Sequence, residues 1–190
     1  MRPLLRLLLA VVLGVGVGGA AEAILKRTWG SGRLLRLDEG GLTVEQKGKQ
    51  PERIEWTKRV NVLRWRYPLL GYPRGGRERR IPAGRVMLAC RLLQDDCSVI
   101  VHCYLRPKWA RGLPEYARFT ELNMADMYSA SFLRRLRRPQ RPSIARSLLA
   151  GRNGQLWVAE KERWTTGFEL EPYDFATLLD ALEHHSAVAS

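Results

Sequence analysis

The chain is poor in the residue types that build metal, redox and disulfide-linked sites. Its 190 residues include only three histidines and three cysteines, the latter Cys90, Cys97 and Cys103. The cysteines form no C-x-x-C pair and the histidines stand at no ligand spacing from them, so the sequence predicts no zinc site. A disulfide framework would use cysteine more densely, and this composition leans towards a reducing compartment.

Motifs for catalysis are also missing. The chain contains no G-x-x-x-x-G-K-[ST], G-x-S-x-G or H-E-x-x-H pattern and no convincing pair of carboxylates. No residue stands out as a nucleophile or a general base. We therefore predict no catalytic residue, no metal and no cofactor, and expect a protein that is not an enzyme.

Acidic residues are scarce relative to basic ones. There are 19 of them against 32 lysines and arginines, which gives a net charge of +13, while 45% hydrophobic and 27% charged residues are typical of a globular chain. Such an excess favours an acidic partner, which can be an anionic membrane leaflet, a nucleic acid or an acidic protein. A general preference for arginine on the surface explains the charge equally well.

The N-terminal segment decides the compartment. Residues 7–21 carry no polar side chain, Arg2 and Arg6 precede them, and cations follow at Lys26 and Arg27. We interpret residues 1–28 as a single-pass transmembrane anchor with a cytoplasmic domain at 29–190, because about 20 apolar residues span a bilayer and cytoplasmic flanks are basic. The alternative is a cleaved signal with an A-x-A site at residues 21–23, which would make the domain periplasmic or secreted.

Alternation of apolar and polar residues predicts a β-meander after residue 33. Strands are expected at 34–37, 42–47 and 53–56, the third continuing or resuming over 60–65, with turns at 38–41 and 48–51. Residues 85–105 predict a hairpin with a two-residue turn at 95–96, so that paired residue numbers sum to 191. In this register one face is wholly apolar, and a slip by one residue would turn that face outwards.

The hairpin register also bears on two candidate ligands. Cys90 and Cys103 become diagonal neighbours about 7–8 Å apart on the apolar face, which favours packed thiols over a disulfide. His102 falls within the strand and is interpreted as a strand residue with a local hydrogen bond.

The remaining elements are expected to be both helical and extended. A helical insertion is predicted at about 107–147, where Pro114 starts a segment with apolar residues every four positions from 124 to 136. Strands are predicted at 155–160 and 165–170. A final helix of about three turns follows Pro172, with an apolar stripe at Phe175, Leu178, Leu179 and Leu182.

Two arginine-rich segments are the candidate binding sites. The loop 67–82 carries Arg74, Arg77, Arg79 and Arg80, and the end of the insertion carries Arg134, Arg135, Arg137 and Arg138. Arginines at such density can bind lipid headgroups or RNA phosphates, whereas a merely solvated loop is the alternative for 67–82.

Three stretches resemble bacterial membrane-associated families with a pleckstrin-homology (PH)-like domain. They are residues 36–44, where a strand turns through Asp38-Glu39-Gly40-Gly41, the I-x-W strand at 54–56, and residues 167–175, where the last strand enters a capping helix. The resemblance covers about 33–106 and 148–185. It implies a curved antiparallel sheet or barrel with a C-terminal capping helix, and binding or scaffolding as the function.

These observations together predict an α+β, mainly β, protein that binds at a membrane. Its basic domain is expected to contact anionic lipid headgroups or a membrane-protein partner. The alternatives are an exported binding protein and RNA binding through the arginine-rich helix, with Trp109 and Tyr128 nearby.

Overall fold

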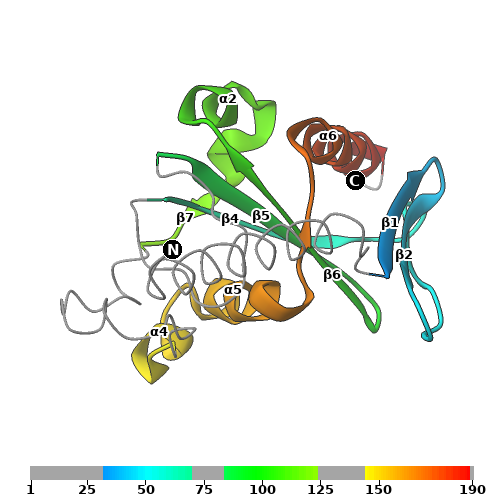
Figure 1. Ribbon diagram of the computed structural model, residues 1–190, viewed down its shortest axis with the longest axis horizontal. Helices are drawn as coiled ribbons and strands as arrows, with labels where there is room; N and C mark the ends of the chain where they lie inside the picture. The colour runs from blue at the N-terminus through cyan, green and yellow to red at the C-terminus, as the bar shows by residue number, and fades with distance from the viewer. Residues whose placement is uncertain (1–31, 70–83, 124–143, 189–190) are drawn as a thin grey trace, which may run out of the picture.

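The computed structural model describes residues 32–69, 84–123 and 144–188, which form an α+β fold (Figure 1). The strands are β1 (Arg33–Asp38), β2 (Gly41–Gln46), β3 (Glu52–Glu55), β4 (Asn61–Pro68), β5 (Val86–Gln94), β6 (Cys97–Leu105), β7 (Thr120–Glu121) and β8 (Phe168–Glu169). The helices are α2 (Pro107–Gly112), the 3-10 helix η1 (Pro114–Arg118), α4 (Arg146–Ala150), α5 (Gly154–Thr166) and α6 (Pro172–Val188).

The first three strands form the expected meander. They make an antiparallel sheet in the order β1-β2-β3, with Leu37 opposite Leu42 across the first turn. Gly41 has no alternative there, because a Cβ at this position would lie 2.1 Å from the carbonyl oxygen of Ile54. The chain then resumes as β4 in a second sheet, ordered β7-β4-β5-β6-β8.

The register predicted for the central hairpin is confirmed. Val86 pairs with Leu105, Cys90 with Val101 and Gln94 with Cys97, so the turn is Asp95-Asp96 as expected. Both faces of this hairpin are buried, including Met87, Ala89 and Ile100 on the face that looked mixed in sequence. The sheet is therefore the middle layer of the fold and is covered on two sides.

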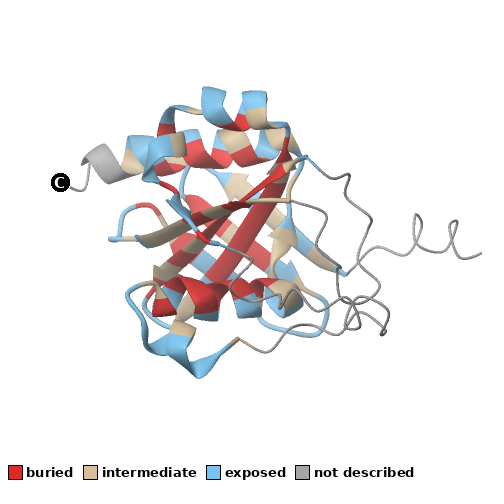
Figure 2. Cartoon of the chain, turned by 90° about the vertical axis from the view of Figure 1, so that its left-hand side faces the viewer, coloured by how far each residue is buried: buried red, intermediate tan, exposed pale blue. Residues whose placement is uncertain are grey.

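Two helices cover the two faces of the five-stranded sheet. Figure 1 shows α6 and α5 on opposite sides of it, and Figure 2 shows the buried residues concentrated between them. The predicted stripe on α6 is confirmed: Phe175, Leu178, Leu179 and Leu182 are all at most 3% exposed and share a core with β1–β3 and the β5–β6 hairpin. The helix is longer than the three turns expected.

The second core lies under α5, and here the predicted strand at 155–160 is wrong, while the one predicted at 165–170 is confirmed only in part. Residues 154–166 are helical, and only β8 falls within the second predicted strand. The buried positions follow helical spacing at Leu156, Trp157, Glu160 and Arg163. Two of these four are charged, so the apolar periodicity that marks a helix is hidden in the sequence.

The described residues do not close into a barrel. Of the expected curved sheet or barrel, the barrel is therefore wrong for this part of the chain. A barrel needs one continuous ladder of strands. Here β3 and β4 belong to separate open sheets, and the five-stranded sheet ends on both sides in strands of two residues, β7 and β8, which pair in parallel with β4 and β6.

The expectation of packed thiols is confirmed. Cys90 and Cys103 are free, at most 1% exposed and part of the α6 core. Burial raises the pKa of both thiols to about 12, so they stay protonated at neutral pH.

Three predicted segments lie wholly or partly outside the described residues. They are the membrane anchor or signal at 1–28, residues 70–82 of the arginine-rich loop and the part of the insertion from 124 to 143. Among the helices that are described, none combines the length and the apolar character needed to cross a bilayer.

Candidate functional site

All eight arginines predicted as binding residues lie outside the described residues, but the points at which their segments attach are described. The segment 70–83 leaves β4 and returns to β5. Its two ends are joined by backbone hydrogen bonds from Leu69 N–H to the Arg85 carbonyl (2.7 Å) and from Gly84 N–H to the Leu69 carbonyl (3.0 Å). Arg74, Arg77, Arg79 and Arg80 are thus attached at the C-terminal end of β4.

The other arginine-rich segment leaves the sheet at the same end. β7 is parallel to β4, with Thr120 beside Trp65, and Leu122 N–H donates to the Arg66 carbonyl at 2.8 Å. Because neighbouring strands are about 4.8 Å apart, the chain enters 124–143 next to the point where it enters 70–83. Ile144, where this segment ends, packs in the same cluster as Leu69.

The charge of the chain is concentrated in the segments outside the described residues. The described residues hold 19 basic and 16 acidic side chains, a net charge of +3, so +10 of the total +13 falls in 1–31, 70–83 and 124–143. Two of these three segments attach at one end of the five-stranded sheet. The described residues are close to neutral by comparison.

A third basic element, which the sequence reasoning missed, follows at this end. β6 ends at Leu105, opposite Val86, and the chain continues into α2. Figure 1 shows α2 and β7 at one end of the five-stranded sheet and β1 and β2 at the other. The exposed side chains of α2 and the residue before it are Arg106, Lys108, Trp109 and Arg111. The signal available was the K-W-A-R run after a strand, which is too short to be diagnostic.

Ion pairs fix η1 beside β4. Glu115 is 3% exposed, and its carboxylate lies 2.9 Å from Arg64 Nη2 and 2.7 Å from Arg118 Nη1. The Arg66 guanidinium lies over the Tyr116 ring at 3.9 Å and donates to the Tyr116 carbonyl at 3.2 Å. These contacts hold the α2–η1 segment rigidly against the sheet, so the end of the sheet is a defined surface.

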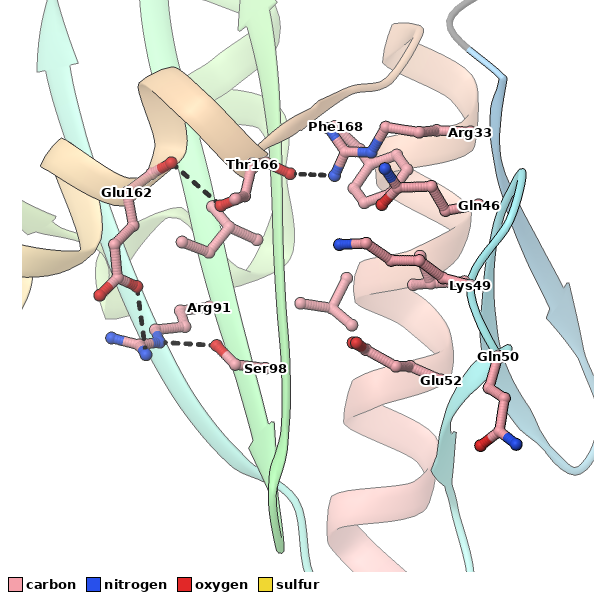
Figure 3. Close-up of a pocket in the computed structure, with 13 residues that line it drawn as sticks. Arg33, Gln46, Lys49, Gln50, Glu52, Arg91, Ser98, Glu162, Thr166 and Phe168 are labelled. Atoms are coloured by element: carbon pink, nitrogen blue, oxygen red, sulfur yellow. Dashed lines mark hydrogen bonds and ion pairs between the residues drawn. The ribbon is translucent and has the colours of Figure 1, made fainter.

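A pocket of about 280 Å³ lies between the two sheets, away from this basic end. Figure 3 shows Lys49 and Glu52 reaching across it from the β2–β3 side towards β6 and the end of α5. On the opposite wall Arg91 pairs with Glu162 (3.2 Å) and donates to Ser98 Oγ (3.0 Å).

The chemistry of this pocket is mixed. At its mouth Arg33 donates to the Thr166 carbonyl and lies 4.0 Å above the Phe168 ring. Lys49 and Glu52 bring charges of opposite sign to the other wall. Since cations and carboxylates alternate around it, the pocket favours neither an anionic nor a cationic ligand.

A buried carboxylate joins α5 to the five-stranded sheet. Glu160 is fully buried and accepts five hydrogen bonds of 2.8–3.0 Å. The donors are Trp65 Nε1, Tyr67 Oη, Trp164 Nε1 and the Nε and Nη2 of Arg163. A carboxylate has about four lone-pair sites, so this one has no capacity left for a substrate. Burial, and then Glu160, raise the pKa of Tyr67 well above 10.

His102 borders this network from β6. Its side chain is 6% exposed, and the Tyr104 ring meets it edge-on at 5.5 Å between centroids. Burial, and then the charge of Arg163, lower the pKa of His102 to about 3, although a hydrogen bond with the Phe168 backbone acts in the opposite direction. The imidazole is therefore neutral at physiological pH.

The low pKa of His102 predicts a loss of stability in acid. The unfolded chain takes up a proton at this histidine below about pH 6.5, whereas the folded protein does so only near pH 3. Stability from this residue is complete above pH 6.5 and falls as the pH drops. Between pH 7 and 5 we expect wild type to lose about 2 kcal/mol more unfolding free energy than His102→Gln, measured by urea denaturation. Equal losses in both proteins would contradict this assignment.

Within the described residues there is no group of three histidine, cysteine or acidic side chains placed to hold a metal ion. Comparisons with protein-family models, with curated proteins and with solved structures found no match to this chain.

Proposed function

We propose that this protein is a non-catalytic, membrane-associated binding module, and that the basic end of its five-stranded sheet contacts anionic lipid headgroups or a membrane-protein partner. One observation carries the proposal: β7 runs parallel to β4 as its neighbour, so both arginine-rich segments depart from one end of the sheet. Because both segments attach at one end, their charges are proposed to act together on one surface.

The energy that each cation contributes near a leaflet, and the distance over which it acts, favour an anionic surface as the partner over an isolated anion. A cation near an anionic leaflet contributes about 1 kcal/mol, and the attraction falls off within a Debye length of about 8 Å at physiological salt. Paired residues of β4 and β7, just before the two attachment points, are about 4.8 Å apart, the spacing of neighbouring strands, which is less than one Debye length. Both segments therefore start within reach of the same leaflet.

The N-terminal segment fits the same proposal. An anchor at 1–28 would keep the domain at the bilayer, because insertion of a transmembrane helix is effectively irreversible. We also propose that the domain belongs with the membrane-associated PH-like families. Support for this is the order of elements, a strand meander and hairpin followed by a C-terminal helix that packs on the core.

Vesicle binding tests the proposal. The fragment 29–190 keeps all described residues. It should bind vesicles that contain about one-third anionic lipid and should not bind vesicles of zwitterionic lipid alone. Because the attraction is electrostatic, we expect binding to weaken at least about tenfold between 50 and 500 mM salt. Binding that does not respond to salt would contradict the proposal, and salt-sensitive binding to RNA without binding to vesicles would favour the nucleic-acid alternative.

The exported alternative requires a separate measurement. N-terminal sequencing of the protein recovered from the membrane fraction should begin at or near Met1 if the segment is an anchor. A mature chain beginning at Ile24 would instead indicate cleavage after the A-x-A site and a domain outside the cytoplasm.

A further inference from the structure

We propose that the exposed face of α2 is a membrane contact, in which Trp109 inserts at the headgroup level of an anionic leaflet. The cations beside it contact the headgroups, and they are Arg106, Lys108 and Arg111. This inference rests on the proposed function and identifies, among the described residues, the ones that touch the bilayer.

The exposure of Trp109 sets it apart from the other tryptophans. Its side chain is 66% exposed, whereas the others in the described residues, Trp56, Trp65, Trp157 and Trp164, are buried or half-buried. An isolated exposed apolar residue is ordinary. A tryptophan within a group of cations is the composition that membrane interfaces favour, because its amphipathic ring is stable at the headgroup level.

The core determines which way α2 faces. Ala110 is fully buried in the α6 core, and Leu113 packs against the same core. The Ala110 N–H donates to the Arg106 carbonyl at 2.9 Å, which closes the turn. Because Ala110 and Leu113 lie three residues apart on the inner face, Trp109 cannot turn inwards without breaking the packing of α2.

The charge around Trp109 is uncompensated. Residues 106–114 include three cations and no acid. None of the three forms an ion pair within the part of the chain that the structure describes. The nearest acid along the chain, Glu115, is buried and already paired with Arg64 and Arg118. A surface with this charge and one apolar ring complements an anionic leaflet.

A lipid surface fits this face better than a nucleic acid does. Proteins that bind single strands stack successive bases on several aromatic residues along a groove. α2 offers one exposed aromatic residue on a single helical turn. The other strongly exposed aromatic side chain in the described residues, Tyr173 at 80%, stands between Glu171 and Asp174, whose charges would repel a phosphate backbone.

Quenching of Trp109 by brominated lipid tests the inference on the full-length protein reconstituted in vesicles. The Trp109 contribution is the fluorescence quenching of wild type minus that of Trp109→Phe. We expect a Trp109 contribution to quenching when the vesicles contain phosphatidylglycerol, and no such contribution in purely zwitterionic vesicles. In vesicles with about one-third anionic lipid, replacing all three cations with glutamine should reduce the Trp109 contribution at least about tenfold, since each cation contributes up to about fivefold to the contact equilibrium. The matched control is the replacement of Arg36, Lys47 and Arg59, three exposed cations of the β1–β3 region, which should reduce the Trp109 contribution less than about twofold.

The outcomes separate this inference from the proposed function. If Trp109 stays unquenched in anionic vesicles while the arginine-rich segments still direct binding of fragment 29–190, the α2 contact is wrong and the proposed function stands. If Trp109 is quenched although replacing those arginines leaves vesicle binding unchanged, the α2 contact is supported and the role proposed for the arginine-rich segments is wrong. Quenching of Trp109 fluorescence by RNA but not by brominated lipid would overturn the lipid as occupant.

Discussion

Replacing Glu160 with alanine should destabilise the fold by about 3–5 kcal/mol, because it leaves Arg163 as a buried charge without its partner. Arg163 is 5% exposed, and its guanidinium is bonded to Glu160 at 2.9 and 3.0 Å. Trp65 and Tyr67 in β4 would lose their acceptor as well. Since a domain of this size is stable by about 5–15 kcal/mol, the loss is a large part of the total. Urea denaturation followed by far-UV circular dichroism measures it.

The matched control is Glu162→Ala in the same helix. Glu162 is half-exposed and pairs with Arg91 at 3.2 Å, so its loss should cost at most about 1 kcal/mol. A similar cost for both variants would mean that the Glu160 network contributes little. The double variant Glu160→Leu with Arg163→Met removes both charges at once, and it should be less destabilised than Glu160→Ala.

Replacing the arginines of both segments with glutamine should abolish vesicle binding by the fragment 29–190. Each segment loses four cations, so each quadruple variant is expected to weaken binding at least about 30-fold, given about 1 kcal/mol for each cation near the leaflet. The first quadruple variant replaces Arg74, Arg77, Arg79 and Arg80. The second replaces Arg134, Arg135, Arg137 and Arg138. If both segments meet one leaflet, the two losses in binding free energy should add. A sedimentation or flotation assay at fixed salt measures them.

Removing the same number of charges elsewhere controls for net charge. The control replaces four exposed cations of the β1–β3 region, Arg36, Lys47, Lys49 and Arg59. It should weaken vesicle binding less than about threefold, because charges more than a Debye length from the leaflet are screened. Equal losses in the control and in either quadruple variant would show that only net charge matters, and the basic end of the sheet would lose its special role.

Patterns that a short stretch of sequence imposes were predictable. The register of the β5–β6 hairpin follows from alternation and one turn, and a slip would expose every apolar residue on one face. Likewise the stripe from Phe175 to Leu182 repeats at helical spacing, which only an α-helix can bury on one side. Local periodicity was enough in both cases, and the packed state of Cys90 and Cys103 followed from the register.

The helix α5 shows where such reasoning fails. Its inner face includes Glu160 and Arg163, which any apolar pattern counts as exposed, and its start at 155–158, Gln-Leu-Trp-Val, contains the aromatic and β-branched residues that are common in strands. Burial of these charges depends in part on the donors that Trp65 and Tyr67 supply from β4, more than 90 residues earlier. A sequence pattern carries no information about such distant partners.

By itself the sequence determined that the chain is strongly basic, lacks recognisable catalytic motifs and places nine of its 26 arginines in two segments, 70–83 and 124–143. The tertiary structure decided where those segments attach. Two residues of β7 pair with β4 across more than 50 positions of sequence, and this contact places Glu121, shortly before 124–143, beside Arg66, shortly before 70–83. The same end of the sheet carries α2 with its exposed Trp109. Pairing over such separations depends on how the whole core packs, and no local pattern encodes it.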